Sequence, residues 1–100
     1  MILKKNIKPI RNGLGLLSKI EGVTFEWRDN RAEKGFQTGL IADEVEKVLP
    51  SAVVEHNDVK RIQEQELGGV YVAAINELHE MVKRLDARVK KLEKELAKKR

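Results

Sequence analysis

The chain of 100 residues contains no cysteine and only four aromatic residues. Without cysteine, disulfide bridges and thiolate metal sites are excluded. The two histidines, His56 and His79, fall in a predicted turn and on a helix flank, so the sequence predicts neither a metal ion nor a cofactor. Because aromatic side chains are few, we expect the compact part of the chain to gain stability by burying apolar surface against partner chains.

Long apolar runs are also missing. No segment approaches the roughly 20 apolar residues that a membrane-spanning helix requires. The amino terminus lacks the charged and apolar pattern of a secretory signal peptide. We therefore expect no membrane partner.

The C-terminal third carries a regular apolar repeat with alternating spacings of three and four residues. We call its members the stripe: Ile75, Leu78, Val82, Leu85, Val89, Leu92 and Leu96. A strict seven-residue repeat keeps facing a partner only if helices supercoil, because an ideal helix drifts by about 20° per heptad. The stripe therefore predicts a coiled coil. A single amphipathic helix packed on its own domain is the alternative.

The charged residues beside the stripe favour parallel helices. Arg88 with Glu93, and Glu95 with Arg100, fall where neighbouring parallel chains exchange opposite charges. A helix from about residue 70 to residue 100 would be roughly 45 Å long. The preceding residues are too few to cover its whole length, so the spacing predicts an oligomer.

Basic residues are concentrated in the same region. Residues 83–100 carry nine Lys or Arg against three acids, while residues 1–82 carry eleven against thirteen, which together give the net charge of +4. A basic coiled coil that binds nucleic acid or another anionic partner is one interpretation. In zipper-type DNA-binding proteins, however, the basic region lies N-terminal to the zipper. Here it overlaps the zipper, which disfavours nucleic acid as a partner.

The residues before the stripe predict a small α+β head (1–66) ahead of a coiled-coil helix (67–100). Helical spacing indicates helices over about 9–19 and 40–49, the second ended by a proline. Alternation predicts a strand over 23–28, an extended segment over 36–39, and a hairpin whose turn is Asn57-Asp58. Gly68-Gly69 is expected to precede the long helix, either as a hinge or simply as its N-terminal boundary. The expected head core is Phe25, Trp27, Leu40, Ile41, Val45 and Leu49.

The sequence offers little for catalysis by itself. The acidic group Asp43, Glu44 and Glu46 lies near a predicted helix start, where carboxylates stabilise the helix dipole. Ser18 and Ser51 do not lie in a nucleophile-elbow context. Composition and spacing alone therefore predict an oligomerising module and not an enzyme.

Three segments carry a family resemblance. Residues 3–10 (LKKNIKPI), 22–27 (GVTFEW) and 39–50 (GLIADEVEKVLP) together resemble the C-terminal intramolecular chaperone domain of bacteriophage tailspikes and tail fibres. That family also includes the self-cleaving domain of myelin regulatory factor. The resemblance implies a homotrimer that sets the register of an upstream fibre or spike polypeptide, its folding client, and is then released by self-cleavage. It also implies assembly in the host cell cytoplasm, with the parent protein in the virion tail.

The resemblance also suggests a catalytic residue. Family cleavage is thought to use the serine of a Ser-Asp-x-Arg-Leu-Lys pattern, with the lysine as its base. Leu3 and Lys4 match the end of this pattern, but Ile2 occupies the arginine position and the serine would fall two places before Met1. Lys4 is the one catalytic residue carried over. As written, the chain is expected to be inactive, either as the released product or as a fragment trimmed near the cleavage point.

The number of chains has two interpretations. Ile or Val at the first core position with Leu at the second favours two-stranded parallel coiled coils. A dimeric coiled-coil adaptor is therefore the alternative to the trimer that the resemblance implies.

Overall fold

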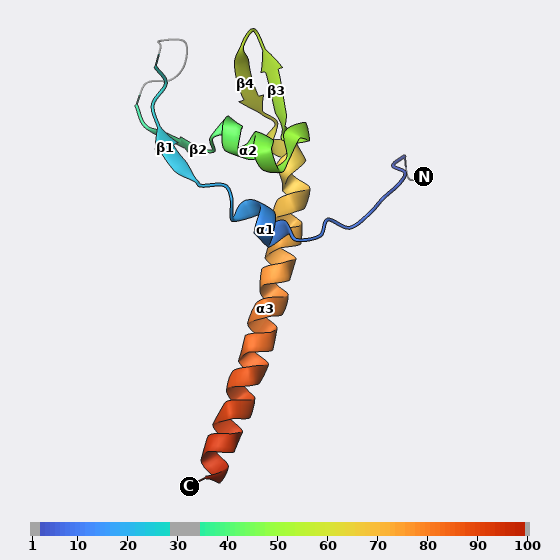
Figure 1. The fold of residues 1–100 in the computed structure, drawn as a ribbon, viewed down its shortest axis with the longest axis vertical. Helices are drawn as coiled ribbons and strands as arrows, with labels where there is room; N and C mark the ends of the chain where they lie inside the picture. The colour runs from blue at the N-terminus through green and yellow to red at the C-terminus, as the bar shows by residue number, and fades with distance from the viewer. Residues whose placement is uncertain (1–2, 29–34, 100) are drawn as a thin grey trace.

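The computed structural model describes residues 3–28 and 35–99 and shows a small head at one end of a long helix (Figure 1). The elements in chain order are α1 (Gly13–Leu17), β1 (Val23–Phe25), β2 (Gln37–Gly39), α2 (Ala42–Val48), the 3-10 helix η1 (Pro50–Ala52), β3 (Val53–His56), β4 (Val59–Ile62) and α3 (Glu64–Lys98). The predicted fold class, α+β with a long C-terminal helix, is confirmed.

Two antiparallel hairpins form the β-structure of the described residues. β1 pairs with β2, with Val23 opposite Gly39, and β3 pairs with β4, with Val53 opposite Ile62. The β3–β4 turn is the predicted pair Asn57 and Asp58, whose φ angles are 52° and 62°. Asn and Asp tolerate this left-handed conformation, and two such residues give a turn whose twist matches that of the strands.

The core of the head lies where α2, η1 and the first turns of α3 meet. Val45 and Ala52 are fully buried and Leu67 is 1% exposed. The partly buried side chains that pack against these three are Ile20, Leu40, Leu49, Val53 and Ile62. Of the six predicted core residues, Val45, Leu40 and Leu49 therefore lie in this cluster.

The other three predicted core residues lie outside this cluster. Phe25 is half-buried and makes an edge-to-face contact with Trp27, at a centroid distance of 5.1 Å. Trp27 follows the end of β1 and is 52% exposed, and Ile41 precedes α2 and is 43% exposed. Alternation predicted which side chains share a face of β1. It did not predict that the β1–β2 hairpin extends away from α3 (Figure 1).

The expectation that Gly68-Gly69 precedes the long helix is wrong, because α3 begins at Glu64 and continues through both glycines. Leu67, Val70 and Ala74 are buried on one face of this helix. Packing of that face against the head outweighs the helix-propensity cost of glycine, about 1 kcal/mol per residue. The 35 residues of α3 span about 52 Å, and its first turns belong to the head's core.

Candidate oligomerisation surface

The stripe predicted from the heptads runs along the exposed side of α3. Its seven side chains are between 50% and 64% exposed, and Met81 beside it is 50% exposed. Soluble monomers rarely expose a contiguous apolar surface of this length, and such surfaces typically mark an interaction site. The single chain therefore presents the stripe to solvent.

The stripe and the face that binds the head are adjacent on α3. At 100° per residue, Leu67, Val70 and Ala74 point roughly 70° away from the stripe residues at the same level. These three are at most 3% exposed, whereas Ile75 is 64% exposed. The helix thus has one apolar face that its own head covers and a second that its own head leaves exposed.

Helix α1 is attached to α3 by a carboxylate and by a glycine. The backbone N–H groups of Gly13 and Leu14 donate hydrogen bonds to Glu77 at 2.6 and 3.3 Å. A Cβ atom at Gly13 would lie 2.8 Å from the backbone nitrogen of Ala74, so a side chain there would push the helices apart. Asn12, which precedes α1, has a φ angle of 61° and makes no side-chain cap hydrogen bond. Glu77 therefore caps α1 from another helix.

A lysine attaches the β3–β4 hairpin to α2. The Lys60 Nζ atom lies 2.9 Å from Asp43 Oδ1 and 2.8 Å from Glu46 Oε1. Hydrogen bonds to Glu46 and then Asp43 raise the pKa of Lys60 above its ordinary value of 10.5. The hydrogen bond from Lys60 holds the pKa of Asp43 below its ordinary value of 3.8. Asp43 and Glu46, which the sequence assigned to the helix dipole, thus also pair with Lys60 of β4. The third acid, Glu44, accepts a hydrogen bond from the backbone N–H of Glu21 at 3.2 Å.

Comparison with known proteins identifies the family of this chain. The family model described as "Chaperone of endosialidase" matches residues 2–54, from the N-terminal segment into β3. The chain belongs to the chaperone of endosialidase family. The resemblance seen in the sequence is therefore confirmed, and three matched segments, 3–10, 22–27 and 39–50, all lie within this match.

Curated relatives of this chaperone-family chain match nearly its whole length. The long tail fiber protein Gp37 of Enterobacteria phage K3 is 38% identical over 96 residues, which cover 94% of this chain and 8% of the relative. The proteins of the same name from Enterobacteria phage T2 and Salmonella phage S16 are also 38% identical, over 94% and 83% of this chain. The chain spans only 7% to 13% of the length of these relatives.

The predicted catalytic residue lies outside the helices and strands of this chaperone-family chain. Lys4 is exposed in the segment before α1, which Figure 1 shows running outward from α3. The hydroxyl of Ser18 donates a hydrogen bond to the carbonyl of Gly15 at 2.7 Å, and Ser51 lies in η1. The structure therefore pairs neither serine with Lys4 in the hydrogen bonds of the described residues.

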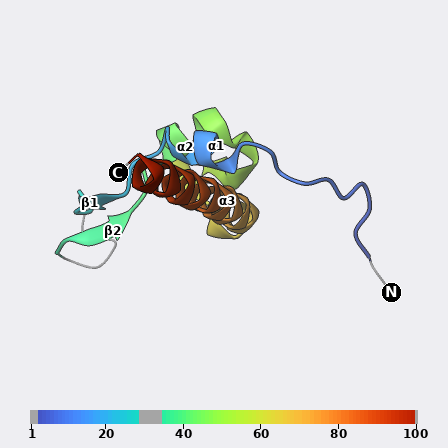
Figure 2. The same ribbon diagram turned by 90° about the horizontal axis from the view of Figure 1, so that it is seen from below.

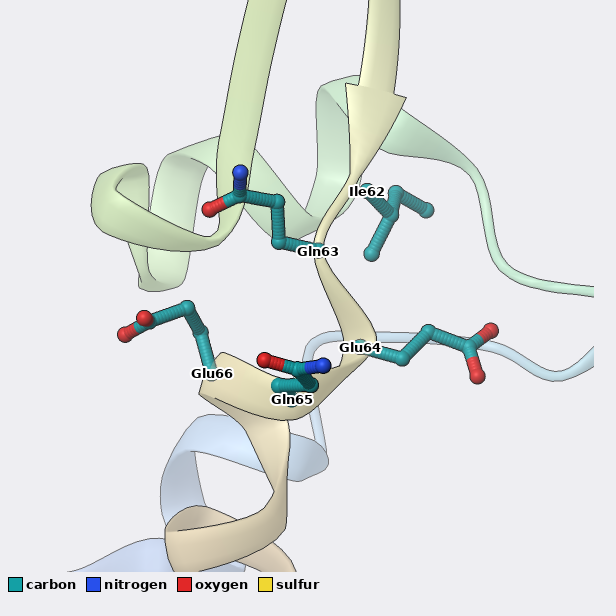
Figure 3. Close-up of a pocket in the computed structure, with 5 residues that line it drawn as sticks. All are labelled: Ile62, Gln63, Glu64, Gln65 and Glu66. Atoms are coloured by element: carbon teal, nitrogen blue, oxygen red, sulfur yellow. The ribbon is translucent and has the colours of Figure 1, made fainter.

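Hollows in the surface of the described residues include one beside the start of α3. This hollow, of about 450 Å³, lies where β4 meets α3 and is lined by residues 62–66. Figure 3 shows the carboxylates of Glu64 and Glu66 pointing to opposite sides of the chain.

Over residues 3–28 and 35–99, no three His, Asp or Glu side chains are grouped to hold a metal ion. In the same residues, no helix is long and apolar enough to cross a bilayer.

Proposed function

We propose that this chain is an intramolecular chaperone for a phage tail fibre or tailspike. In this proposal three copies associate through the stripe of α3, set the register of the attached fibre chains, and are released by self-cleavage. Assembly takes place in the host cell cytoplasm, and the mature parent protein belongs to the virion tail. The observation that carries the proposal is the exposed stripe, supported by family membership and by the tail fibre relatives.

The position of the head suits this role. The head lies at the N-terminal end of α3 (Figure 1), so three parallel helices would bring three heads together at one end. The segments before α1 would start from the same level in each chain. Fibre chains attached there would gain a high effective concentration and a common alignment. Alignment matters because long-range β-pairing is slow and sensitive to register.

The association is tested by light scattering across a dilution series. The proposal predicts a mass of about 34 kDa, three times the 11.4 kDa of one chain, that persists on dilution. A mass of two chains would replace the trimer with the dimeric adaptor. A mass of one chain at every concentration would contradict association through the stripe.

Self-cleavage is the second part of the proposal, and Lys4 is its residue in this chain. On a longer polypeptide that reads Ser-Asp-x-Arg before Leu3, the Lys4 amine would accept the serine proton as the hydroxyl attacks the carbonyl carbon of the peptide bond that precedes the serine. The C–N bond breaks, its nitrogen takes the proton from Lys4, and water hydrolyses the ester left on the serine oxygen, which releases the preceding chain. Release would leave the fibre kinetically trapped, because the domain that guided its folding would be gone. Mass spectrometry of such a precursor should show two fragments, and its Lys4→Met variant should stay intact. An uncut precursor that still associates would contradict only the cleavage step.

A further inference from the structure

We propose that the head of each chain packs against the α3 helix of the adjacent copy, with Val72 at the centre of that contact. This inference rests on the parallel association proposed above and names a surface that the stripe does not include. The occupant of this surface is a second copy of the chain. Each head would then bind two α3 helices, its own and the neighbouring one.

Val72 lies on the flank of α3 that its own head leaves uncovered. At 100° per residue it is roughly 90° from the stripe and about 170° from the face that carries Val70 and Ala74. The side chain of Val72 is 59% exposed, whereas Ala74 is 2% exposed. Figure 2, viewed from below, shows α1 and α2 together on one side of α3. The head therefore covers one flank, and Val72 occupies the opposite one.

The heptad register brings these two flanks together between chains. In a heptad written abcdefg, positions a and d form the core. In a parallel coiled coil, position g, just before a, lies against position e, just after d, of the neighbouring helix. Ala74 directly precedes Ile75, a first core residue. Val72 directly follows Tyr71, which lies seven residues before Leu78 and so holds the second core position. The Val72 flank of one copy therefore meets the Ala74 flank of the next, which is the flank that α1 covers.

The charges further along α3 favour this parallel arrangement. Arg88 holds the same heptad position as Ala74, and Glu93 holds the same position as Val72. The charges of Arg88 and Glu93 are opposite. Opposite charges at these positions favour parallel, in-register neighbours. An antiparallel bundle would instead place like flanks together and move the heads to opposite ends.

The residue type at position 72 fits an apolar occupant. The same heptad position further along the helix holds His79, Asp86 and Glu93, which are polar and exposed. The change to valine occurs at the level of the head, where α1 presents Leu14 and Leu16, both only partly buried. An apolar side chain at the edge of a coiled coil is favourable where another apolar surface covers it. The head of the neighbouring copy supplies that surface.

The absence of cysteine allows a direct test by cross-linking. Ser18 at the end of α1 is exposed, so Ser18→Cys and Val72→Cys together place one thiol on the head and one on the opposite flank of α3. We expect a short bis-maleimide to produce covalent species of two and three chains on a denaturing gel. Each single-cysteine variant is a control and should give no more than traces. The size of the largest covalent species also reports how many chains form the closed ring.

Light scattering on the same samples separates the two proposals. An associated mass with no cross-linking above the single-cysteine controls would overturn the head-to-neighbour contact and leave the proposed association intact. A one-chain mass for the wild type would overturn both.

A second variant makes the test independent of the engineered thiols. Val72→Ser should lower the melting temperature of the associated protein, because the neighbour's head would lose its apolar contact. Val59→Ser changes a valine of the β3–β4 hairpin that is 45% exposed and should leave it nearly unchanged. Equal shifts for the two variants would overturn the inference.

Discussion

The two parts of α3 differ in what covers them. From Leu67 to Glu77 the helix packs against α1 and η1 of its own chain, and Leu67 shares the core cluster with Val45 of α2. Leu67 and Ala74 are almost fully buried. From Leu78 to Lys98 the large apolar side chains are at least half exposed, although they repeat along the helix at least as regularly as those of the covered segment. One helix thus combines a segment with an apolar face that its own head covers and a segment whose apolar stripe is exposed in the single chain.

This difference predicts that folding and association are coupled. An isolated helix gains little from its own hydrogen bonds, and most helical stability in proteins comes from packing of an apolar face. The ion pairs on α3, such as Lys90 with Asp86 at 3.1 Å, add only a few tenths of a kcal/mol each. The stripe in the C-terminal part of α3 is exposed in the single chain, so we expect the stability of this part to depend on association with other chains.

The largest effect is expected from a charge in the middle of the stripe. Leu85→Asp would place a carboxylate in the apolar interface, where an unpaired charge is very unfavourable. We expect light scattering to show a single chain at concentrations where the wild type is associated. Ala87→Asp introduces the same charge two residues away, outside the stripe, and should retain the wild-type mass. Equal loss of association in both variants would contradict an interface centred on the stripe.

Alanine substitutions at two leucines of α3 distinguish its covered part from its exposed part. Leu67→Ala removes a buried side chain and should lower the free energy of unfolding by about 3 kcal/mol at every protein concentration. Leu92→Ala removes a side chain that is 60% exposed in the single chain, so its cost should appear only where chains associate. Chemical denaturation at several protein concentrations measures both. A concentration-independent cost for Leu92→Ala would remove the distinction between the two parts.

The contact between α1 and α3 should be sensitive to a single methyl group. Gly13→Ala would place a Cβ atom against the backbone of Ala74 and weaken the hydrogen bonds to Glu77, at a cost of about 2 kcal/mol. Gly68→Ala is the matched change, because a Cβ atom there meets nothing within 4 Å. It should raise the stability by up to about 1 kcal/mol, since alanine favours the helix. Thermal unfolding followed by circular dichroism should give opposite signs, and equal signs would contradict the packing of α1.

The smallest effect is expected at the contact between β4 and α2. Because the pKa of Asp43 is lowered in the folded chain, its contribution is present above pH 3.8 and is lost as pH falls through the folded value. Because the pKa of Lys60 is raised, its contribution is present below pH 10.5 and is lost as pH rises through the folded value. Lys60→Met should therefore slightly lower the melting temperature at neutral pH.

The acid end of this pH dependence gives the test. The difference in melting temperature between wild type and Lys60→Met should disappear well below pH 3.8, where Asp43 is protonated. Lys83→Met, which removes an exposed partner of Glu80 on α3, is the control and should show no comparable difference. A Lys60→Met difference that persists unchanged in acid would contradict the pairing.

Local patterns in the sequence predicted much of the fold. The Asn57-Asp58 turn, the helix that ends before Pro50 and the long C-terminal helix follow from nearest-neighbour rules of conformation and periodicity. The stripe was also visible, because its side chains repeat within one element. That other chains cover it, and how many, stays a prediction.

Contacts between distant residues were not visible in the sequence. Gly13 and Glu77 are 64 positions apart, and Lys60 is 17 positions from Asp43, so no spacing rule relates them. The predicted helix over 9–19 is reduced to Gly13–Leu17, where Glu77 provides the cap. Likewise, local rules predict that Gly68-Gly69 interrupts a helix. The helix continues because buried side chains on either side of the two glycines pack against the head.

Hydrogen exchange along α3, measured at high and low protein concentration, distinguishes a segment that other chains stabilise from a segment that its own head stabilises. If chains associate through the stripe, amides from Leu78 to Lys98 should lose protection on dilution together with the three-chain mass. Amides from Leu67 to Glu77 should keep more protection, because their own head still covers them. Equal and concentration-independent protection along the whole of α3, in a sample with the mass of one chain, would show that association through the stripe does not stabilise this helix.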